Sequence, residues 1–102
     1  MKYKIVFTKL ARITNEYNLS FLNKFSHSYA SKMRYYIIQN IEALKSFPNA
    51  FSIYIKNQDH IFRKLTINHL YHIIYTVSNN KVIILYITDA RKASDNYLSY
   101  LK

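Results

Sequence analysis

The sequence predicts a small α+β domain in which an antiparallel sheet packs on a helical hairpin, with the element order β-α-α-β-β-β. Alternating apolar residues mark strands at the start and in the second half of the chain, and apolar residues three or four positions apart mark two helices between them. At 102 residues the chain is long enough for one hydrophobic core and too short for two. We therefore expect one two-layered domain over residues 1–102.

The first strand is predicted at residues 2–8, where the alternating residues Tyr3, Ile5 and Phe7 fall on one face. From Lys9 onward the apolar spacing becomes three or four, which predicts an amphipathic helix. Its apolar stripe consists of Leu10, Ile13, Tyr17, Phe21 and Phe25. A surface helix turns such a stripe toward the core. Three asparagines in the same segment lower its helix propensity.

A second helix is predicted to begin near Ser26 or Ser28, either of which can act as an N-cap. Pro48, the only proline, ends the helical region, because the residue before a proline avoids helical geometry. The apolar stripe of this helix is predicted to be core and consists of Ala30, Met33, Ile37, Ile41 and Leu44.

The second half of the chain is predicted to hold a connector, 49–59, followed by the strands 60–67, 70–77 and 81–89. The turns between these strands carry asparagine, which tolerates positive φ in a chain without glycine. The last strand is apolar on both faces, which favours an interior position in the sheet. A short tail after residue 89 is a possible helix.

Charge is the strongest global signal, with 15 Lys and Arg against five Asp and Glu, a formal net charge of +10. Such a field attracts nucleic acid, an anionic membrane or an acidic protein. The basic residues recur from Lys2 to Lys102, which favours a folded domain with a basic face over a basic tail. The chain has no cysteine, no long apolar run, no signal-peptide pattern and no ligand-like histidine spacing. We therefore expect a cytoplasmic protein with no cofactor, no metal and no membrane association.

Candidate site residues follow from the phase of the strands. If Leu65 and Ile67 face the helices, Lys64 points to the other face, where His72 of the next strand can meet it. Arg91 leaves the last strand near the same end, and Tyr97 follows six residues later.

Lysine, histidine and arginine supply the base, acid and cationic groups for metal-free RNA cleavage, and an aromatic ring can stack on a base. Each residue also has a plainer interpretation. His72 can be an ordinary strand residue, Lys64 a solvated edge charge and Tyr97 a packing residue. Arg91 can simply pair with a nearby aspartate.

The stretch FRKLTINHLYHIIYTVSNNKVIILYITDAR, residues 62–91, resembles the C-terminal half of the RelE/ParE superfamily, the small toxins of type II toxin–antitoxin pairs. The shared pattern is a basic-Leu strand, a turn, a Tyr-basic-apolar-apolar-Tyr strand, a polar hairpin, an apolar strand and a polar break with arginine. The upstream strand and helical hairpin agree in order and length.

The resemblance to the ribonuclease branch implies catalytic roles for Arg91, for Tyr97 and for the basic residue Lys64. His72 stands where that branch has an arginine, and Asp89 lies where several relatives have histidine, so both depart from the pattern. Two further basic residues are predicted to bind substrate, Arg63 and Lys92.

The resemblance therefore predicts a toxin that cuts messenger RNA on the ribosome and is silenced by an acidic antitoxin. The alternative is a non-enzymatic inhibitor of DNA gyrase, as in the ParE branch, which needs no catalytic set. A third possibility is an inactive basic domain that binds nucleic acid.

Overall fold

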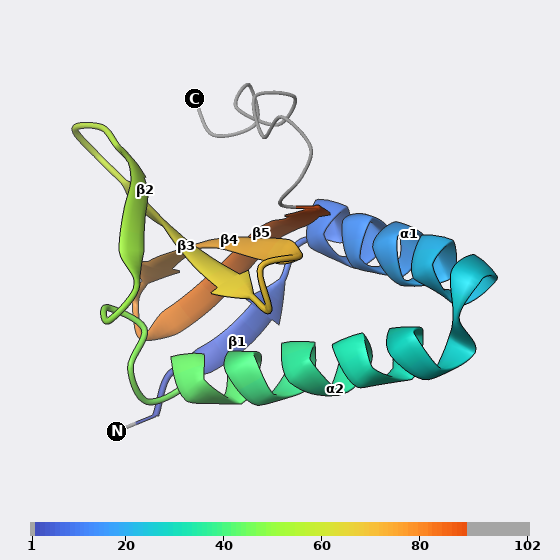
Figure 1. Cartoon of the computed structure of the whole chain (residues 1–102). Helices are drawn as coiled ribbons and strands as arrows, with labels where there is room; N and C mark the ends of the chain where they lie inside the picture. The colour runs from blue at the N-terminus through green and yellow to red at the C-terminus, as the bar shows by residue number, and fades with distance from the viewer. Residues whose placement is uncertain (1, 90–102) are drawn as a thin grey trace.

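The computed structural model describes residues 2–89, which form two helices and a five-stranded sheet (Figure 1). In chain order the elements are β1 (Lys4–Phe7), α1 (Lys9–Phe25), α2 (His27–Leu44), β2 (Ser52–Lys56), β3 (Ile61–Ile67), β4 (Tyr71–Ser78) and β5 (Lys81–Asp89). The predicted α+β class and helical hairpin are confirmed. Neither helix in residues 2–89 is long and apolar enough to cross a bilayer.

The sheet has the strand order β1-β5-β4-β3-β2 and differs from the prediction in two ways. The four strands from β2 to β5 pair antiparallel, whereas β1 pairs parallel with the first half of β5, so the sheet is mixed. The intervening chain is long enough for a parallel pair. The added strand β2 lies in the predicted connector, where a register shift between Ile53 and Ile55 interrupts its pairing with β3.

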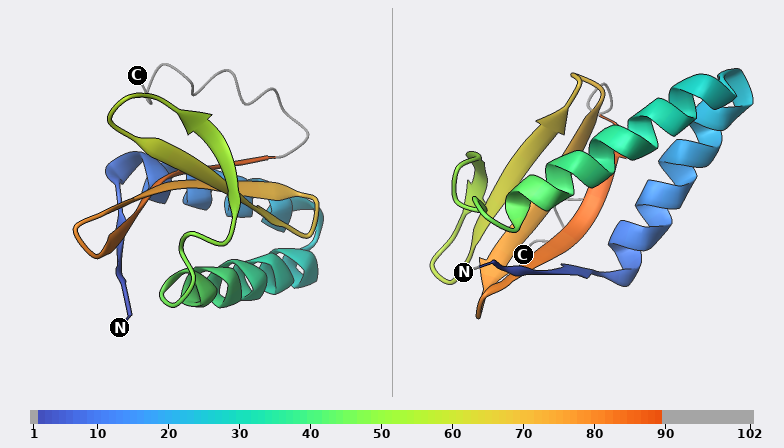
Figure 2. Two further views of the ribbon diagram at one scale, coloured as in Figure 1. Left: turned by 90° about the vertical axis from the view of Figure 1, so that its left-hand side faces the viewer. Right: turned by 90° about the horizontal axis from the view of Figure 1, so that it is seen from below.

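Helix α2 follows its prediction. The Ser26 hydroxyl accepts a hydrogen bond from the Tyr29 backbone N–H at 3.1 Å and caps the helix. The whole predicted stripe is buried, at 0–9 % exposure. It packs on one face of the sheet with the inward residues of β3, β4 and β5, such as Leu65, Ile73 and Ile84. The right-hand view of Figure 2 has α2 crossing this face and α1 running beside β5.

Helix α1 is rotated relative to its prediction. Four residues of the predicted stripe are exposed, namely Ile13 (55 %), Tyr17 (61 %), Phe21 (46 %) and Phe25 (76 %). We call these four residues the α1 stripe. The buried residues of the helix are instead Ala11, Thr14, Asn18, Leu19 and Leu22. The expectation that the stripe faces the core is therefore wrong.

The reason lies at the edge of β5, because β1 pairs only with residues 81–84 of that strand. Further along, the Asn18 side-chain amide donates to the Ile87 carbonyl at 2.9 Å. The Ile87 N–H in turn donates to the Thr14 hydroxyl at 3.0 Å. Both side chains complete backbone hydrogen bonds that a neighbouring strand would otherwise make, so the polar side of α1 is the buried side.

The two hairpin turns confirm the role expected of asparagine. Positive φ values of 52° and 57° occur at Asn68 and His69, and values of 50° and 63° at Asn79 and Asn80. Two consecutive residues with positive φ make the turn that matches the twist of paired strands. Asparagine and histidine are enriched in this region when glycine is absent.

Candidate functional site

The face of the sheet opposite the helices carries two rows of side chains set by strand register. One row contains Lys64, Ile74 and Tyr86, and the next contains Thr66, His72 and Thr88. Phe62, Ile74 and Tyr86 form a small buried cluster on this face. We call this side of the sheet, opposite α2, the open face, although Ile74 and Tyr86 on it are themselves fully buried. Strand alternation thus places Lys64 and His72 on one side of the sheet, as the sequence predicts.

Lys64 is half-buried and lies at the middle of strand β3. Its ammonium nitrogen lies 5.4 Å from the centre of the Tyr54 ring, a cation–π distance. Tyr54 belongs to β2, the strand missing from the prediction. The aromatic ring restricts the lysine side chain and holds its charge at the open face.

His72 is half-buried, and its Nδ1 lies 2.8 Å from the Thr66 hydroxyl oxygen. The pKa of His72 is lowered from its ordinary value of 6.5, first by burial and second by the positive charge of Lys64. The imidazole is therefore neutral at physiological pH, and the threonine orients one of its ring nitrogens. A neutral, oriented imidazole can accept a proton.

Register also fixes the relation between the two basic residues. Lys64 pairs with Ile74, two residues from His72, so the two residues are diagonal neighbours, whose backbone positions lie about 7–8 Å apart in a regular sheet. This separation accounts for the electrostatic influence of Lys64 on His72 without direct contact.

Asp89 ends β5 and pairs in register with Tyr71. It is 8 % exposed, and its charge raises the pKa of His72 less than burial and Lys64 lower it. Asp89 is therefore a buried strand residue whose electrostatic effect on His72 is outweighed.

Arg63 lies on the other face of the sheet, with the helices, and is not brought together with Lys64 and His72. Its guanidinium donates to the Phe51 carbonyl at 2.7 Å. Nearby, the Tyr75 hydroxyl donates to the Pro48 carbonyl at 2.6 Å, and burial raises the pKa of Tyr75 to about 12. Arg63 and Tyr75 thus anchor the segment between α2 and β2, and Arg63 has a structural contact that the sequence did not predict.

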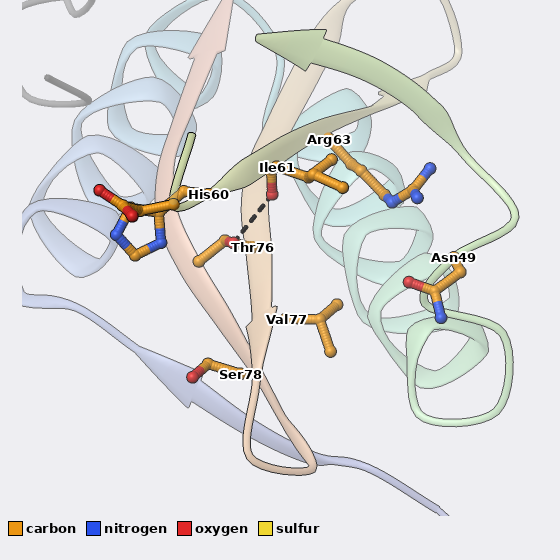
Figure 3. Close-up of a pocket in the computed structure, with 8 residues that line it drawn as sticks. Asn49, His60, Ile61, Arg63, Thr76, Val77 and Ser78 are labelled. Carbon is orange, nitrogen blue, oxygen red and sulfur yellow. Dashed lines mark hydrogen bonds between the residues drawn. The ribbon is translucent and has the colours of Figure 1, made fainter. Parts of the chain in front are cut away.

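A hollow of about 280 Å³ lies beside Arg63 (Figure 3). Figure 3 shows Arg63 and Asn49 on one side of Val77 and His60 on the other. The Thr76 hydroxyl donates to the Ile61 carbonyl at 2.9 Å and ties β4 to the end of β3. Neither Lys64 nor His72 lines the hollow.

The other predicted site residues, Arg91, Lys92 and Tyr97, lie outside the described residues. The structure adds two residues that sequence reasoning missed, Thr66 and Tyr54. The alternation of the SIYIK segment could have indicated a strand containing Tyr54. In residues 2–89, no group of three or more His, Cys, Asp or Glu side chains is placed to hold a metal ion.

Comparison with known proteins gives a structural match and no sequence match. No protein-family model matches the chain, and no curated protein matches it either. A chain of the solved structure "Chromosomal ParDE TA system from P. aeruginosa" superposes with a TM-score of 0.72 at 15 % identity. The match covers 88 % of this chain and 98 % of that chain. The two chains share a fold, which confirms the predicted RelE/ParE-like architecture.

Proposed function

We propose that this chain is the toxin component of a toxin–antitoxin module. Its support is the fold shared with a chain of a ParDE system, together with the sequence pattern in residues 62–91. The net charge of +10 suits an acidic antitoxin and a nucleic-acid target.

For the activity, we propose metal-independent cleavage of messenger RNA on the ribosome. The observation that carries this proposal is the Lys64–His72 pair on the open face, with a neutral imidazole oriented by Thr66. His72 accepts the proton of the ribose 2′-OH as the 2′-oxygen attacks the phosphorus. Lys64 stabilises the charge on the phosphate and is the candidate proton donor to the leaving 5′-oxygen. In this proposal Arg91 adds a second cation and Tyr97 stacks on a base.

The test follows ribosome-bound messenger in a translation extract, with cleavage sites mapped by primer extension. His72→Gln and Lys64→Ala are each expected to slow cleavage about 10²–10⁴-fold, because each removes one proton-transfer or charge-stabilising group. Arg91→Ala combined with Tyr97→Ala should do the same. The matched control is Lys81→Ala, which removes the same charge from an exposed site at the start of β5. Equal loss in this control would attribute the effect to net charge alone.

The second candidate function is inhibition of DNA gyrase, in the manner of the ParE branch that the sequence resembles. The specific observation in its favour is that the matched chain belongs to a ParDE system. This function requires none of the open-face chemistry. Intact messenger accompanied by gyrase-dependent DNA breaks in the same extract would overturn the ribonuclease proposal and support this one.

A further inference from the structure

One wall of the hollow beside Arg63 is the segment between α2 and β2, which carries Asn49 (Figure 3). Two hydrogen bonds hold this segment in place, one on each side of Asn49. The Tyr75 hydroxyl donates to the Pro48 carbonyl at 2.6 Å. The Arg63 guanidinium donates to the Phe51 carbonyl at 2.7 Å. The wall therefore has a defined position before a ligand arrives, which lowers the entropic cost of binding.

A second wall of the hollow is the turn between β2 and β3, which carries Asp59 and His60. The Asn57 side-chain oxygen accepts hydrogen bonds from the backbone N–H groups of Asp59 and His60, at 3.0 and 2.8 Å, and so fixes the turn. The His60 ring lies 5.7 Å from the Phe62 ring, measured between centroids. The turn therefore brings a carboxylate and a flat ring to the hollow.

Arg63 is the charged group on the other side of Val77 from His60 (Figure 3). Its guanidinium is half-buried and has several N–H donors, of which the Phe51 carbonyl takes one. None of the carboxylates in residues 2–89 forms an ion pair with it. Partial burial of a cation is costly without a paired anion. The remaining donors match the oxygens of a phosphate, so Arg63 is the anion-binding end of the hollow.

The two ends of the hollow carry opposite charges, which orient a ligand. Asp59 is exposed, and within the described part of the chain it forms no ion pair. Its carboxylate repels an anionic group and accepts hydrogen bonds from N–H donors. Between the two charges, Ile61 and Val77 offer apolar contact. A ligand that fits has an anionic group at Arg63, a carbon skeleton over Val77 and N–H donors at Asp59.

We propose that this hollow binds a nucleoside monophosphate, with its phosphate on Arg63 and its base beside Asp59 and His60. The volume of about 280 Å³ is close to the lower limit of roughly 300 Å³ for ligand pockets, which suits a single nucleotide. An imidazole ring can stack on the face of a base. Guanine also carries an amino donor that a carboxylate can accept.

Other anionic ligands are poorer occupants. Inorganic phosphate would pair with Arg63 alone and leave the apolar contacts and Asp59 unused. A continuous RNA strand would bring further phosphates toward the carboxylate of Asp59, which repels them. The inference does not rest on the toxin function, because Lys64 and His72 are not among the residues that line the hollow.

The test is a titration of ¹⁵N-labelled protein with guanosine 5′-monophosphate, followed by NMR of the backbone amides. We expect the resonances of Asn49, His60 and Ser78 to move with one dissociation constant, while those of Lys64 and His72 stay in place. Guanosine and inorganic phosphate each supply one half of the ligand. Each should bind at least about tenfold more weakly than the nucleotide, because it loses the contacts at one end.

Two variants then test the anionic end. Arg63→Gln should weaken nucleotide binding at least about tenfold. Its matched control is Arg34→Gln, which removes the same charge from an exposed position on α2. Asn49→Asp leaves the bond from Arg63 to Phe51 intact and keeps the proposal testable if Arg63→Gln fails to fold. It puts a carboxylate on the wall beside Arg63 and should weaken binding to a similar degree, with Gln39→Glu as the control.

Asp59→Asn tests the other end and should weaken the nucleotide without weakening inorganic phosphate. Loss of both ligands in this variant, or of neither, would overturn the proposed orientation. Equal affinity for phosphate and nucleotide would reduce the hollow to an anion site and overturn the proposal. Equal weakening by the control variants, or resonance changes at Lys64 and His72, would also overturn it. Tighter binding of a 5′-phosphorylated tetranucleotide would overturn it in favour of an RNA surface.

Discussion

The two helices have similar apolar periodicity, but α2 turns its apolar stripe toward the core and α1 turns most of its predicted stripe toward solvent. In α2 the apolar stripe is buried and the polar side is exposed. In α1 four of the five predicted stripe residues are exposed, and the buried side includes Thr14 and Asn18. The helices differ in what lies beside them. Helix α2 packs on apolar strand residues, whereas α1 lies along a strand edge with backbone groups to satisfy.

This difference shows that periodicity identifies the apolar side of a helix but not the side that is buried. Burial of a polar side chain is favourable where it completes otherwise unmade backbone hydrogen bonds, since each buried unpaired group costs about 1–3 kcal/mol. The apolar side of α1 is then the exposed side.

The largest difference in the free energy of unfolding is expected between the same substitution, isoleucine to alanine, made on α2 and on α1. Ile37→Ala removes a side chain that is 4 % exposed and should lower the free energy of unfolding by about 2–5 kcal/mol, because it leaves a cavity. Ile13→Ala, at 55 % exposure, should change it by less than about 0.5 kcal/mol. Urea denaturation measures both. Similar losses in the two variants would show that Ile13 is part of the core.

A second pair of variants tests the buried polar side of α1. Asn18→Ala removes the donor to the Ile87 carbonyl and should cost about 1–3 kcal/mol of unfolding free energy. The control is Asn23→Ala on the same helix, whose amide oxygen bonds the exposed His27 ring at 2.7 Å. This variant should cost less than about 0.5 kcal/mol. Equal stabilities would contradict the edge-capping role of Asn18.

The smallest expected effect is a change in the pKa of His72 when the charge of Lys64 is removed from the open face. Lys64→Met removes a positive charge that lowers the pKa of His72, so the pKa should rise, as followed by NMR of the imidazole ring. His69, an exposed turn residue, serves as the internal reference. An unchanged His72 pKa would show that the two charges do not interact.

The same lowered pKa makes stability depend on pH. The unfolded chain binds the proton of His72 more tightly than the folded chain does. The contribution of His72 is therefore fully present above its ordinary pKa of 6.5 and is lost as pH falls from 6.5 toward the folded value. A His72→Gln variant should lose less stability over this range.

Sequence patterns predicted the elements that local chemistry determines. Helix α2, its Ser26 cap and the asparagine turns follow from periodicity, capping and backbone preference. Strand β2 was missed, because its bulge and exposed Ile53 weaken an already short pattern. The orientation of α1 could not be predicted, because it depends on which edge of β5 lacks a strand partner, a property of the assembled sheet.

The candidate site likewise contains some relations that the sequence predicted and others that depend on the assembled fold. Strand alternation correctly placed Lys64 and His72 on one face, because that relation is set by side-chain phase. Alternation alone did not reveal that Arg63 anchors the Phe51 backbone, or that Tyr54 lies beside Lys64. Both contacts depend on the path of the chain from α2 through β2. The roles of Arg91, Lys92 and Tyr97 stay predictions.

The hydrogen bonds that Asn18 donates to Ile87 and that Thr14 accepts from Ile87 also bear on aggregation. Where a strand extends beyond a shorter neighbour, its backbone N–H and C=O groups are left unpaired. Such an edge can pair with an extended segment of another chain and so promote aggregation. Here the edge at Ile87 is already occupied by side chains of α1. Pairing of another strand at that point would require displacement of α1. Asn18 and Thr14, which orient the helix, therefore also block strand addition at this edge.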